Sequence, residues 1–446
     1  MMKKKTNCLR GIAFPLLMAF VLAFAMASCG GDEWHPVEPY VPPTPEEPEE
    51  PSEPTDPTKP KEPTFTPLHV DGRWFVDENG VRHNLHGFAQ TYSPWFNEQM
   101  TKWNNYDVSA CLKYNQDLID KILERGWKMD FVRLHMDPYW SNTPGVQTTG
   151  ENDISAFDVE RFKKYLDEVF IPMAEYAIAK GLYVVMRPPG VCPEQISVGG
   201  VYHNYLKQVW RIVAQHPKLS NNGYVMFELA NEPIQICNSS GKAVDNWNGA
   251  TFDERGQLIT TFMQQIVDMM RQYCDNIILV PGLHYQMLYK TFEKYPVKGK
   301  NIGYAVHCYP GWYNSGYDKE VDVVYDNFKA GWDDEIMPIG RKAPIVVTEM
   351  DWAPAVYNKS WGKAITGVAG ANGFGANFMK VCDESCNISW LLFTGPEHLA
   401  QYDDSAPDGN SFLTDPQACP RPVYRKYLYY ATPAYSNMIN KEDYGK

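Results

Sequence analysis

The chain has 446 residues, a formal charge of −13 and an aromatic content of 14%. This length is ample for one large α/β barrel with inserted loops. Nucleic-acid binding requires a basic surface that this charge balance does not supply, so we expect no nucleic-acid partner. No His/Cys cluster has metal-ligand spacing and no glycine-rich phosphate loop follows a predicted strand, so we expect no metal or other cofactor. We also expect a monomer.

The amino terminus has the pattern of a targeting signal. Basic residues precede an apolar run from Gly11 to Ala27, which leads into Met26-Ala27-Ser28-Cys29. This tetrapeptide resembles a bacterial lipobox, so we predict a signal peptide at 1–28 and a lipid on Cys29. The alternative is a membrane-spanning anchor, because the run is close to the roughly 18 apolar residues that a span needs. Gly30 stands where an inner-membrane retention signal places Asp, so the resemblance implies an outer-membrane lipoprotein whose anchor binds the membrane.

Proline and glutamate dominate the segment that follows, from Asp32 to Pro63. Few apolar residues separate them, so this segment cannot bury a core. Dense proline favours extended polyproline II, and the clustered acids repel one another. We therefore predict a disordered linker over 29–64 that acts as a spacer, and a catalytic domain over 65–446.

The first elements of this domain form a predicted β-hairpin. Arg73–Val76 and Val81–Leu85 flank Asn79-Gly80, a pair that readily takes the positive φ values of a tight turn. Such a hairpin would close the floor of a barrel. Strand-like stretches follow at Asn84–Phe88, Asp130–Leu134, Tyr183–Met186, Tyr224–Leu229, Asn276–Val280, Ile302–Val306, Ile345–Thr348 and Ser389–Phe393. Amphipathic, helix-like stretches lie among them at Val108–Arg125, Asp158–Lys180, Tyr202–Gln215, Phe252–Tyr273 and Tyr424–Ala431. This alternation predicts an eight-stranded parallel (β/α)₈ TIM barrel.

Two of these apolar strands lead to carboxylates. The first is Phe227-Glu228-Leu229-Ala230-Asn231-Glu232-Pro233, and the second is Ile345-Val346-Val347-Thr348-Glu349-Met350. A parallel barrel presents catalytic residues at the carboxyl ends of its strands, and two carboxylates on opposite sides of one bond suggest glycoside hydrolysis. The Asn-Glu-Pro run resembles the acid/base signature of glycoside hydrolase family 5, and the Thr-Glu run resembles its nucleophile strand.

Other strands carry further residues of the family pattern, in the same order. Arg133 ends the second strand, His307 and Tyr309 follow the sixth, and Trp390 lies on the eighth. The resemblance implies that Arg133 supports the nucleophile, that the Tyr309 hydroxyl lies near it, and that Trp390 is an aromatic platform under the sugar. Singly, each residue also fits a structural use, as a paired Arg, a core His or a packed Trp. Their common order in a chain of barrel length favours the family.

The resemblance also implies catalytic roles. Glu232 would be the general acid that later becomes the base, and Glu349 the nucleophile of a double displacement. Asn231 would bond the sugar 2-hydroxyl, and His307 would bond the sugar or support Tyr309. Glu228, about 13 Å before Glu232 along an extended strand, is assigned a structural use.

The third strand departs from the family pattern. Many members carry an Asp-x-His type run there, whereas this chain has Arg187 followed by Pro188-Pro189-Gly190. A sugar-contacting His is therefore absent or replaced by Arg187, which affects the substrate more than the acid/base chemistry. Aromatic residues in the predicted loops could line a cleft for a polymer, with about half of them packing instead. They are Trp95, Phe96, Trp103, Tyr139, Trp140, Trp312, Tyr313 and Trp352.

The chain has ten cysteines, of which Cys8 leaves with the signal peptide and Cys29 takes lipid. The other eight lie in a predicted oxidising compartment, where disulfides persist. Cys192 with Cys237 is the first candidate pair, and Cys382 with Cys386 the second.

Together these features predict a lipid-anchored, retaining endo-β-glycosidase that hydrolyses a β-1,4-linked glucan. A β-mannanase, or another family 5 hydrolase of plant polysaccharide, would keep every catalytic residue named above. A non-catalytic, glycan-binding surface lipoprotein would share the anchor, the spacer and the aromatic residues. Such a binding protein needs neither Glu232 nor Glu349, so the presence of both argues against it.

Overall fold

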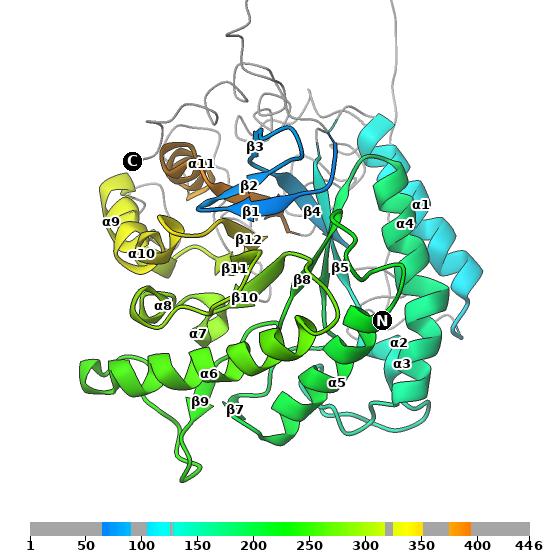
Figure 1. Cartoon of the computed structure of the whole chain (residues 1–446), viewed down its shortest axis with the longest axis horizontal. Helices are drawn as coiled ribbons and strands as arrows, with labels where there is room; N and C mark the ends of the chain where they lie inside the picture. The colour runs from blue at the N-terminus through cyan, green and yellow to red at the C-terminus, as the bar shows by residue number, and fades with distance from the viewer. Residues whose placement is uncertain are drawn as a thin grey trace, which may run out of the picture. The chain divides into compact units, whose positions relative to one another are not determined.

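A computed structural model of the chain describes residues 65–90, 105–124, 127, 129–316, 324–350 and 374–393. Within these ranges eight parallel strands form a closed barrel in which β8 pairs with β10 (Figure 1). The predicted (β/α)₈ barrel is confirmed, with the eight strands in the predicted order. They are β4 (His86–Gln90), β5 (Phe131–His135), β6 (Tyr183–Arg187), β8 (Val225–Glu228), β10 (Ile278–Pro281), β11 (Ile302–Cys308), β12 (Ile345–Met350) and β13 (Ile388–Leu392).

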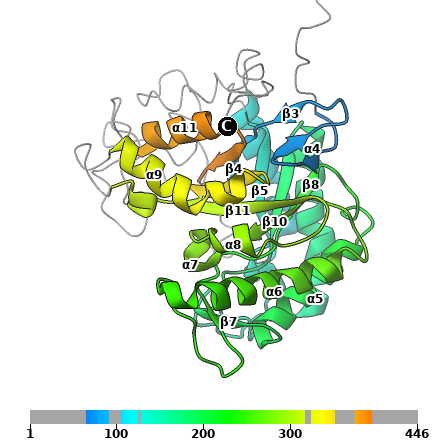
Figure 2. The ribbon, with the colours of Figure 1, turned by 60° about the vertical axis from the view of Figure 1, so that its left-hand side comes forward.

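Helices surround the strands on the outside (Figures 1 and 2). The longer ones are α1 (Val108–Glu124), α3 (Val159–Tyr165), α4 (Ile171–Ala179), α5 (Val201–Gln215), α6 (Phe252–Met270), α9 (Tyr325–Glu335) and α11 (Phe374–Ser385). The short ones are α2 (Pro138–Ser141), η2 (Gly249–Thr251), α7 (Leu283–Gln286), α8 (Thr291–Lys294), η3 (Trp312–Asn314) and α10 (Met337–Gly340). The predicted helix Tyr424–Ala431 and the predicted segments 1–28 and 29–64 lie outside the described residues. Of the helices described, none is long and apolar enough to cross a membrane.

One predicted helix contains an irregular turn. The stretch Asp158–Lys180 folds as α3, a π-helical turn η1 (Leu166–Phe170) and α4. Asp158 caps its start by accepting the backbone N–H groups of Glu160 and Arg161. Pro172 lies in the first turn of α4 and has no N–H to donate to the preceding turn, which accounts for the widened turn before it.

The predicted hairpin is present as part of a small antiparallel sheet. Its strands are β1 (His69–Asp71), β2 (Trp74–Val76) and β3 (Arg82–His83), and Gly80 makes the turn with a φ of +77°. Leu68 and Phe75 are buried in the same apolar cluster as the residues that fill the barrel interior. Leu68 also donates its N–H to the Gly223 carbonyl, before β8, at 3.0 Å. The amino-terminal end of the barrel is therefore closed, as predicted, which leaves the carboxyl ends of the strands for a functional site.

The two predicted disulfides are wrong. Cys192 and Cys237 are buried thiols that are not bonded to each other, and the buried Cys382 and Cys386 are likewise not joined by a disulfide. The thiol of Cys237 points to the Gln195 side-chain oxygen at 3.5 Å. Cys382 lies in the last turns of α11, and the Cys386 N–H donates to its carbonyl in a helical i,i+4 arrangement, which separates the two Cβ atoms by about 5–6 Å, more than a disulfide spans.

Candidate active site

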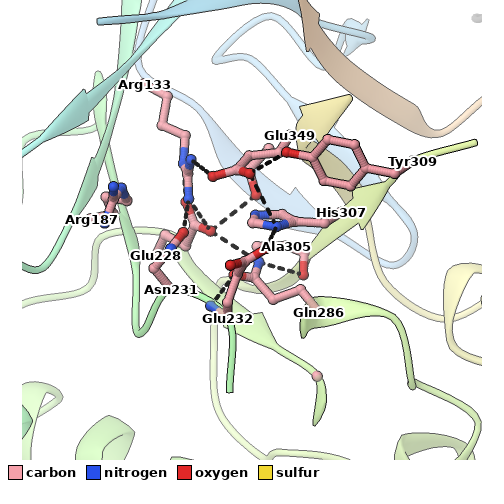
Figure 3. A network of polar contacts seen from close by, with 12 residues as sticks. Arg133, Arg187, Glu228, Asn231, Glu232, Gln286, Ala305, His307, Tyr309 and Glu349 are labelled. Carbon is pink, nitrogen blue, oxygen red and sulfur yellow. Dashed lines mark hydrogen bonds and ion pairs between the residues drawn. The ribbon is translucent and has the colours of Figure 1, made fainter. Parts of the chain in front are cut away.

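Six of the predicted site residues meet at the carboxyl ends of the barrel strands (Figure 3). Arg133 comes from β5, His307 from the end of β11 and Glu349 from β12, and Tyr309 follows β11 directly. Asn231 and Glu232 lie just after β8. These side chains come from strands far apart in the sequence, and parallel pairing alone brings them together.

Glu349 is held by charge and hydrogen bonds on both oxygens. Arg133 Nη1 donates to its Oε1 at 2.8 Å, and the Tyr309 hydroxyl donates to its Oε2 at 2.5 Å. Burial would raise the pKa of Glu349, but the positive charges of His307 and Arg133 and the hydrogen bond from Tyr309 outweigh burial and lower the pKa to about 2. The carboxylate is therefore ionised at neutral pH and has the charge that a nucleophile needs.

A β-bulge aligns His307 with this carboxylate. The pairing of β11 with β12 shifts between Val306 and His307, so that His307 lies opposite Glu349 and not opposite Thr348. The extra residue lies in β12, and because successive side chains of a strand point to opposite faces, it re-aims the Glu349 side chain to the same side as His307. Its Nδ1 lies 3.1 Å from Glu232 Oε1 and 3.5 Å from Glu349 Oε2. His307 thus bridges the two carboxylates through one ring nitrogen.

Glu232 lies on a backbone turn of unusual conformation. Its φ is +56°, a left-handed value that non-glycine residues rarely adopt. The turn is held in place because the Glu232 N–H donates to the side-chain oxygen of Gln286 at 2.8 Å. The Glu232 side chain keeps 25% of its surface exposed, whereas that of Glu349 keeps 9%. Glu232 therefore faces the open side of the site, where a substrate group can reach it.

Arg133 is fully buried and is bound by a second carboxylate, Glu228. Its Nε donates to Glu228 Oε2 at 2.7 Å, and its Nη2 donates to Glu228 Oε1 at 2.9 Å. Burial alone would lower the pKa of Arg133, but Glu228 and Glu349 raise it above its ordinary value. Nη2 also donates to Asn231 Oδ1 at 2.7 Å, which leaves the amide Nδ2 of Asn231 as the donor for a ligand. Glu228 has a structural use, as predicted, but it contacts Arg133, which in turn contacts Glu349.

Sequence reasoning missed two residues that hold Glu228. Gln286 Nε2 donates to Glu228 Oε1 at 3.0 Å, and Thr348 Oγ1 donates to the same oxygen at 3.0 Å. Gln286 belongs to a run of three non-glycine residues with positive φ, which begins at His284. No sequence pattern predicts this run of positive φ values, because none of its residues is Gly or Asn. Through Gln286 the turn at Glu232 is joined to the ion pairs around Arg133.

The third strand ends in a buried arginine, as the departure from the family pattern suggested. Arg187 Nη1 donates to the Gly190 carbonyl at 2.7 Å, and its side chain lies beside the network in Figure 3. Burial lowers the pKa of Arg187, and burial raises the pKa of the nearby Glu151 carboxyl. Both groups interact electrostatically with Glu349, so Arg187 at this strand end adds a buried cation beside the site, and Glu151, from the segment before α3, adds an acid.

Trp390 does not occupy the position predicted for a sugar platform. It lies inside β13 with its side chain fully buried. Its ring packs edge-on against Phe378 of α11 and against His86, with centroid distances of 5.6 and 5.2 Å. Side chains alternate along a strand, and the neighbouring Leu391 belongs to the barrel interior while Trp390 belongs to the layer between barrel and helices. The prediction for Trp390 is therefore wrong.

The predicted loop aromatics divide into core and site residues. Tyr139, Trp140 and Tyr313 are buried in the main core. Trp312 is half-buried and stands edge-on to Tyr309 at 5.2 Å between ring centroids. The other four, Trp95, Phe96, Trp103 and Trp352, lie outside the described residues.

The two central carboxylates lie close together. One carboxylate oxygen of Glu232, one of Glu349 and one ring nitrogen of His307 all lie within 4.8 Å of one another. Retaining glycosidases place their two carboxyl groups about 5–5.5 Å apart, and inverting ones about 6.5–9.5 Å apart. One oxygen of Glu232 and one of Glu349 thus lie within 4.8 Å of each other, so the two carboxylates are close neighbours. The same three donors could also hold a metal ion, although acidic groups at a catalytic site are common without one.

Comparison with known proteins agrees with this geometry. Residues 76–393 match the model of the family described as cellulase (glycosyl hydrolase family 5). The chain belongs to this family. The predicted glycoside hydrolase fold and family are thereby confirmed, and the match covers every barrel strand from β4 to the end of β13.

Individual relatives are distant. An endoglucanase from Bacillus sp. (strain KSM-635) is 26% identical over 230 residues, which are 48% of this chain and 21% of that protein. An endoglucanase from Halalkalibacter akibai is 24% identical over 250 residues, 54% of this chain and 26% of that protein. The chain thus spans about a quarter or less of these relatives. A beta-glucanase from Saccharophagus degradans shares the fold, with a TM-score of 0.55 and 17% identity over 84% of this chain and 98% of that one.

Proposed function

We propose that this protein is a retaining endo-β-glycosidase that hydrolyses a β-1,4-linked glucan. The observation that carries the proposal is the short distance between the carboxylates of Glu232 and Glu349, since one oxygen of each lies within 4.8 Å of the other. A water molecule cannot stand between the nucleophile and the anomeric carbon at the spacing of retaining enzymes, so the reaction passes through a covalent ester.

In the first step Glu349 attacks the anomeric carbon and Glu232 protonates the departing glycosidic oxygen. The low pKa of Glu349, about 2, keeps the nucleophile charged, and Tyr309 and Arg133 fix its orientation. In the second step Glu232, now ionised, takes a proton from water, which attacks the ester.

Two further residues fit supporting roles in these steps. The free amide nitrogen of Asn231 is suited to donate to the sugar 2-hydroxyl, a contact that strengthens as the ring flattens in the transition state. His307 contacts both carboxylates through Nδ1 and is suited to hold the two side chains in position.

The choice of glucan as substrate rests on similarity. Two relatives are named endoglucanases, and the barrel resembles a beta-glucanase whose structure was determined in complex with cellotetraose, at a TM-score of 0.54 and 17% identity. A β-mannanase would use the same carboxylates, so the substrate needs its own test. A non-catalytic glycan-binding protein would have no use for the buried ion pairs that hold Glu349, which disfavours that alternative.

We also propose an outer-membrane lipoprotein, anchored through Cys29 and held away from the membrane by the linker 29–64. The support is the lipobox-like tetrapeptide ending in Cys29 and the proline- and glutamate-rich composition after it. A monomeric catalytic domain that meets polysaccharide at the surface of the membrane fits this arrangement.

Proton NMR of fresh hydrolysate tests the mechanism. The first product should be the β-anomer, because two inversions retain configuration. An initial α-anomer would mean a single displacement and would refute Glu349 as nucleophile. A panel of cellulose, mixed-linkage glucan, xyloglucan, mannan and xylan tests the substrate, and preferential cleavage of mannan would replace the glucanase assignment with a mannanase.

Variants test the two roles separately. Glu349→Ala should remove most turnover on every substrate. Glu232→Ala should be partly rescued by an aryl glycoside whose leaving group needs little protonation. Equal losses of Glu232→Ala on good and poor leaving groups would contradict its role as the acid.

A further inference from the structure

One peptide group carries the backbone strain of Glu232. The carbonyl of Asn231 and the N–H of Glu232 belong to this same planar unit. The Cys192 N–H donates to the carbonyl at 2.8 Å, and the Gln286 side chain accepts the N–H at 2.8 Å. The left-handed φ of Glu232, +56°, is a rotation that starts from this plane, and such a conformation persists only where its surroundings hold it. The direction of the Glu232 side chain therefore depends on both hydrogen bonds.

Cys192 belongs to the loop after β6, residues 188–193, which we call the β6 loop. This loop begins with two consecutive prolines, which have no N–H to close a turn. A side chain closes it instead, because Arg187 Nη1 donates to the Gly190 carbonyl at 2.7 Å. Arg187 ends β6 and Gly190 lies two residues before Cys192, so this hydrogen bond sets the path of the chain towards Asn231.

Two other segments hold the β6 loop. A Cβ on Gly190, whose φ is +77°, would lie 2.1 Å from the Glu151 carbonyl oxygen, so only glycine fits there. The Val191 N–H donates to the same carbonyl at 3.1 Å. The Tyr205 hydroxyl of α5 donates to the Pro189 carbonyl, also at 3.1 Å. The β6 loop is therefore fixed in position by the segment before α3 and by α5.

Arg187 is a buried cation. Only 3% of its surface is exposed, and its Nε has no hydrogen-bond partner among the described residues. A buried charge is unfavourable unless nearby charges compensate it. Burial lowers the pKa of Arg187, and the carboxylates of Glu151 and Glu349 act in the opposite direction. A neutral side chain could donate to Gly190 without this cost of burial, so the cation ties the β6 loop to the acidic groups of the site.

We infer that Arg187 is a positioning residue for Glu232, which acts through the β6 loop to fix the peptide group between Asn231 and Glu232. Without the hydrogen bond from Arg187 to Gly190, the Cys192 anchor loosens, the peptide group is free to rotate and the left-handed strain relaxes. The Glu232 carboxyl then turns away from the leaving oxygen. The inference rests on the proposed function, because it takes Glu232 as the general acid. Many members of the family carry an Asp-x-His type run at this strand end, so the arrangement is a departure of this chain from the family pattern.

Arg187→Met tests this role, since methionine keeps most of the length of the side chain and removes its donors and its charge. The substrates are phenyl β-cellobioside and 2,4-dinitrophenyl β-cellobioside, which carry the same sugars and differ in how much their leaving group needs a proton. The loss of kcat/KM should be about tenfold larger for the phenyl substrate, a part of the roughly 10²–10⁴-fold that a general acid contributes. A merely structural role would lower both values equally, because it reduces the amount of active protein and not the action of the acid.

Arg271→Met is the matched control. Arg271 also donates to backbone carbonyls, those of Cys274 and Lys300, and its Nε is likewise buried without a partner in the described part of the chain. It follows α6 and precedes β10, so it lies at the end of the barrel opposite the site. This variant should keep the wild-type ratio of kcat/KM for the two substrates, and circular dichroism checks that each variant is folded.

Tyr205→Phe takes the place of Arg187→Met if the latter does not fold. It removes the second side-chain donor of the β6 loop and keeps the ring, so the ratio should change in the same direction, by about threefold. Tyr183→Phe is its control, because the Tyr183 hydroxyl also donates to a backbone carbonyl, that of Thr66 at 2.8 Å, but at the closed end of the barrel.

Equal losses on the two substrates in the variant tested would overturn the inference. Glu232→Ala distinguishes this outcome from a failure of the proposed function. If Glu232→Ala loses much more activity on the phenyl substrate, Glu232 is the acid and only the role of Arg187 falls. If Glu232→Ala loses equally on both substrates, the proposed function is wrong, and the inference falls with it.

Discussion

The hydroxyl of Tyr309 provides a direct way to test why Glu349 is ionised. Tyr309→Phe removes one hydrogen bond of 2.5 Å to Glu349 Oε2 and leaves the ring, which packs against Trp312. A hydrogen bond to a charged group contributes about 1.5–3 kcal/mol, and 1.36 kcal/mol corresponds to one pKa unit. The pKa of Glu349 should therefore rise from about 2 by roughly one to two units.

The direction of the pH effect follows because the ionised form of Glu349 is the active one. Glu349 loses its activity as the pH falls through its pKa, so the acidic limb of kcat/KM should lie well below neutral pH in the wild type and should move to higher pH in the variant. The assay is a profile of kcat/KM against pH with an aryl cellobioside, whose good leaving group makes the protonation of Glu232 unimportant. Residual activity after return to neutral pH separates titration from acid unfolding.

Tyr176→Phe is the matched control, because the Tyr176 hydroxyl also donates to a carboxylate, Asp120 Oδ2, at 2.7 Å but lies outside the site. Its acidic limb should be that of the wild type. If the limb of Tyr309→Phe also stays in place, Tyr309 does not stabilise the ionised form of Glu349, and the low pKa of Glu349 must come from the charges of His307, Arg133 and Arg187.

Three further predictions concern the supports of the site and the anchor. Gln286→Ala removes the partner of the Glu232 N–H and of one Glu228 oxygen, so the free energy of unfolding in urea should fall by about 1–3 kcal/mol. The kcat of this variant should fall more for substrates with poor leaving groups than for those with good ones. Equal losses of kcat on both kinds of substrate would show that Glu232 is not displaced. Glu228→Gln removes the charge that pairs with buried Arg133 and should lower that free energy by about 3–5 kcal/mol, whereas a change below 1 kcal/mol would mean that Glu349 alone compensates the guanidinium. Cys29→Ala should abolish palmitate labelling and membrane partition of the full-length protein, and a wild-type protein that is soluble and unlabelled would refute the lipid anchor.

The fold was predictable from the sequence because the pattern of a strand followed by a helix or loop is repeated eight times. Each barrel strand is a short apolar run buried on both faces, such as Tyr183–Arg187 and Val225–Glu228, and each is set apart by a helix or a loop. The positions of Arg133 and Glu349 were also predictable, because the carboxyl ends of all strands of a parallel barrel lie at the same end of the barrel.

Other parts of the site depend on local geometry that no pattern of residue types encodes. Gln286 becomes a support of Glu232 only because the backbone turns left-handed at a residue that is neither Gly nor Asn. Trp390 was misplaced because a one-residue difference along a strand reverses the face of a side chain. The predicted disulfides failed because loop proximity does not fix the direction of a thiol, and Cys382 with Cys386 have a helical spacing.

The pairing of one arginine with two carboxylates has a consequence for the reaction itself. Before attack, the buried Arg133 faces negative charge from both Glu228 and Glu349. In the proposed double displacement, formation of the glycosyl ester would remove the charge of Glu349, and a buried guanidinium without a partner would cost about 3–5 kcal/mol. Glu228, held by Gln286 and Thr348, keeps Arg133 compensated throughout. The second carboxylate therefore lets the nucleophile lose and regain its charge without exposing the interior of the barrel to an unpaired ion.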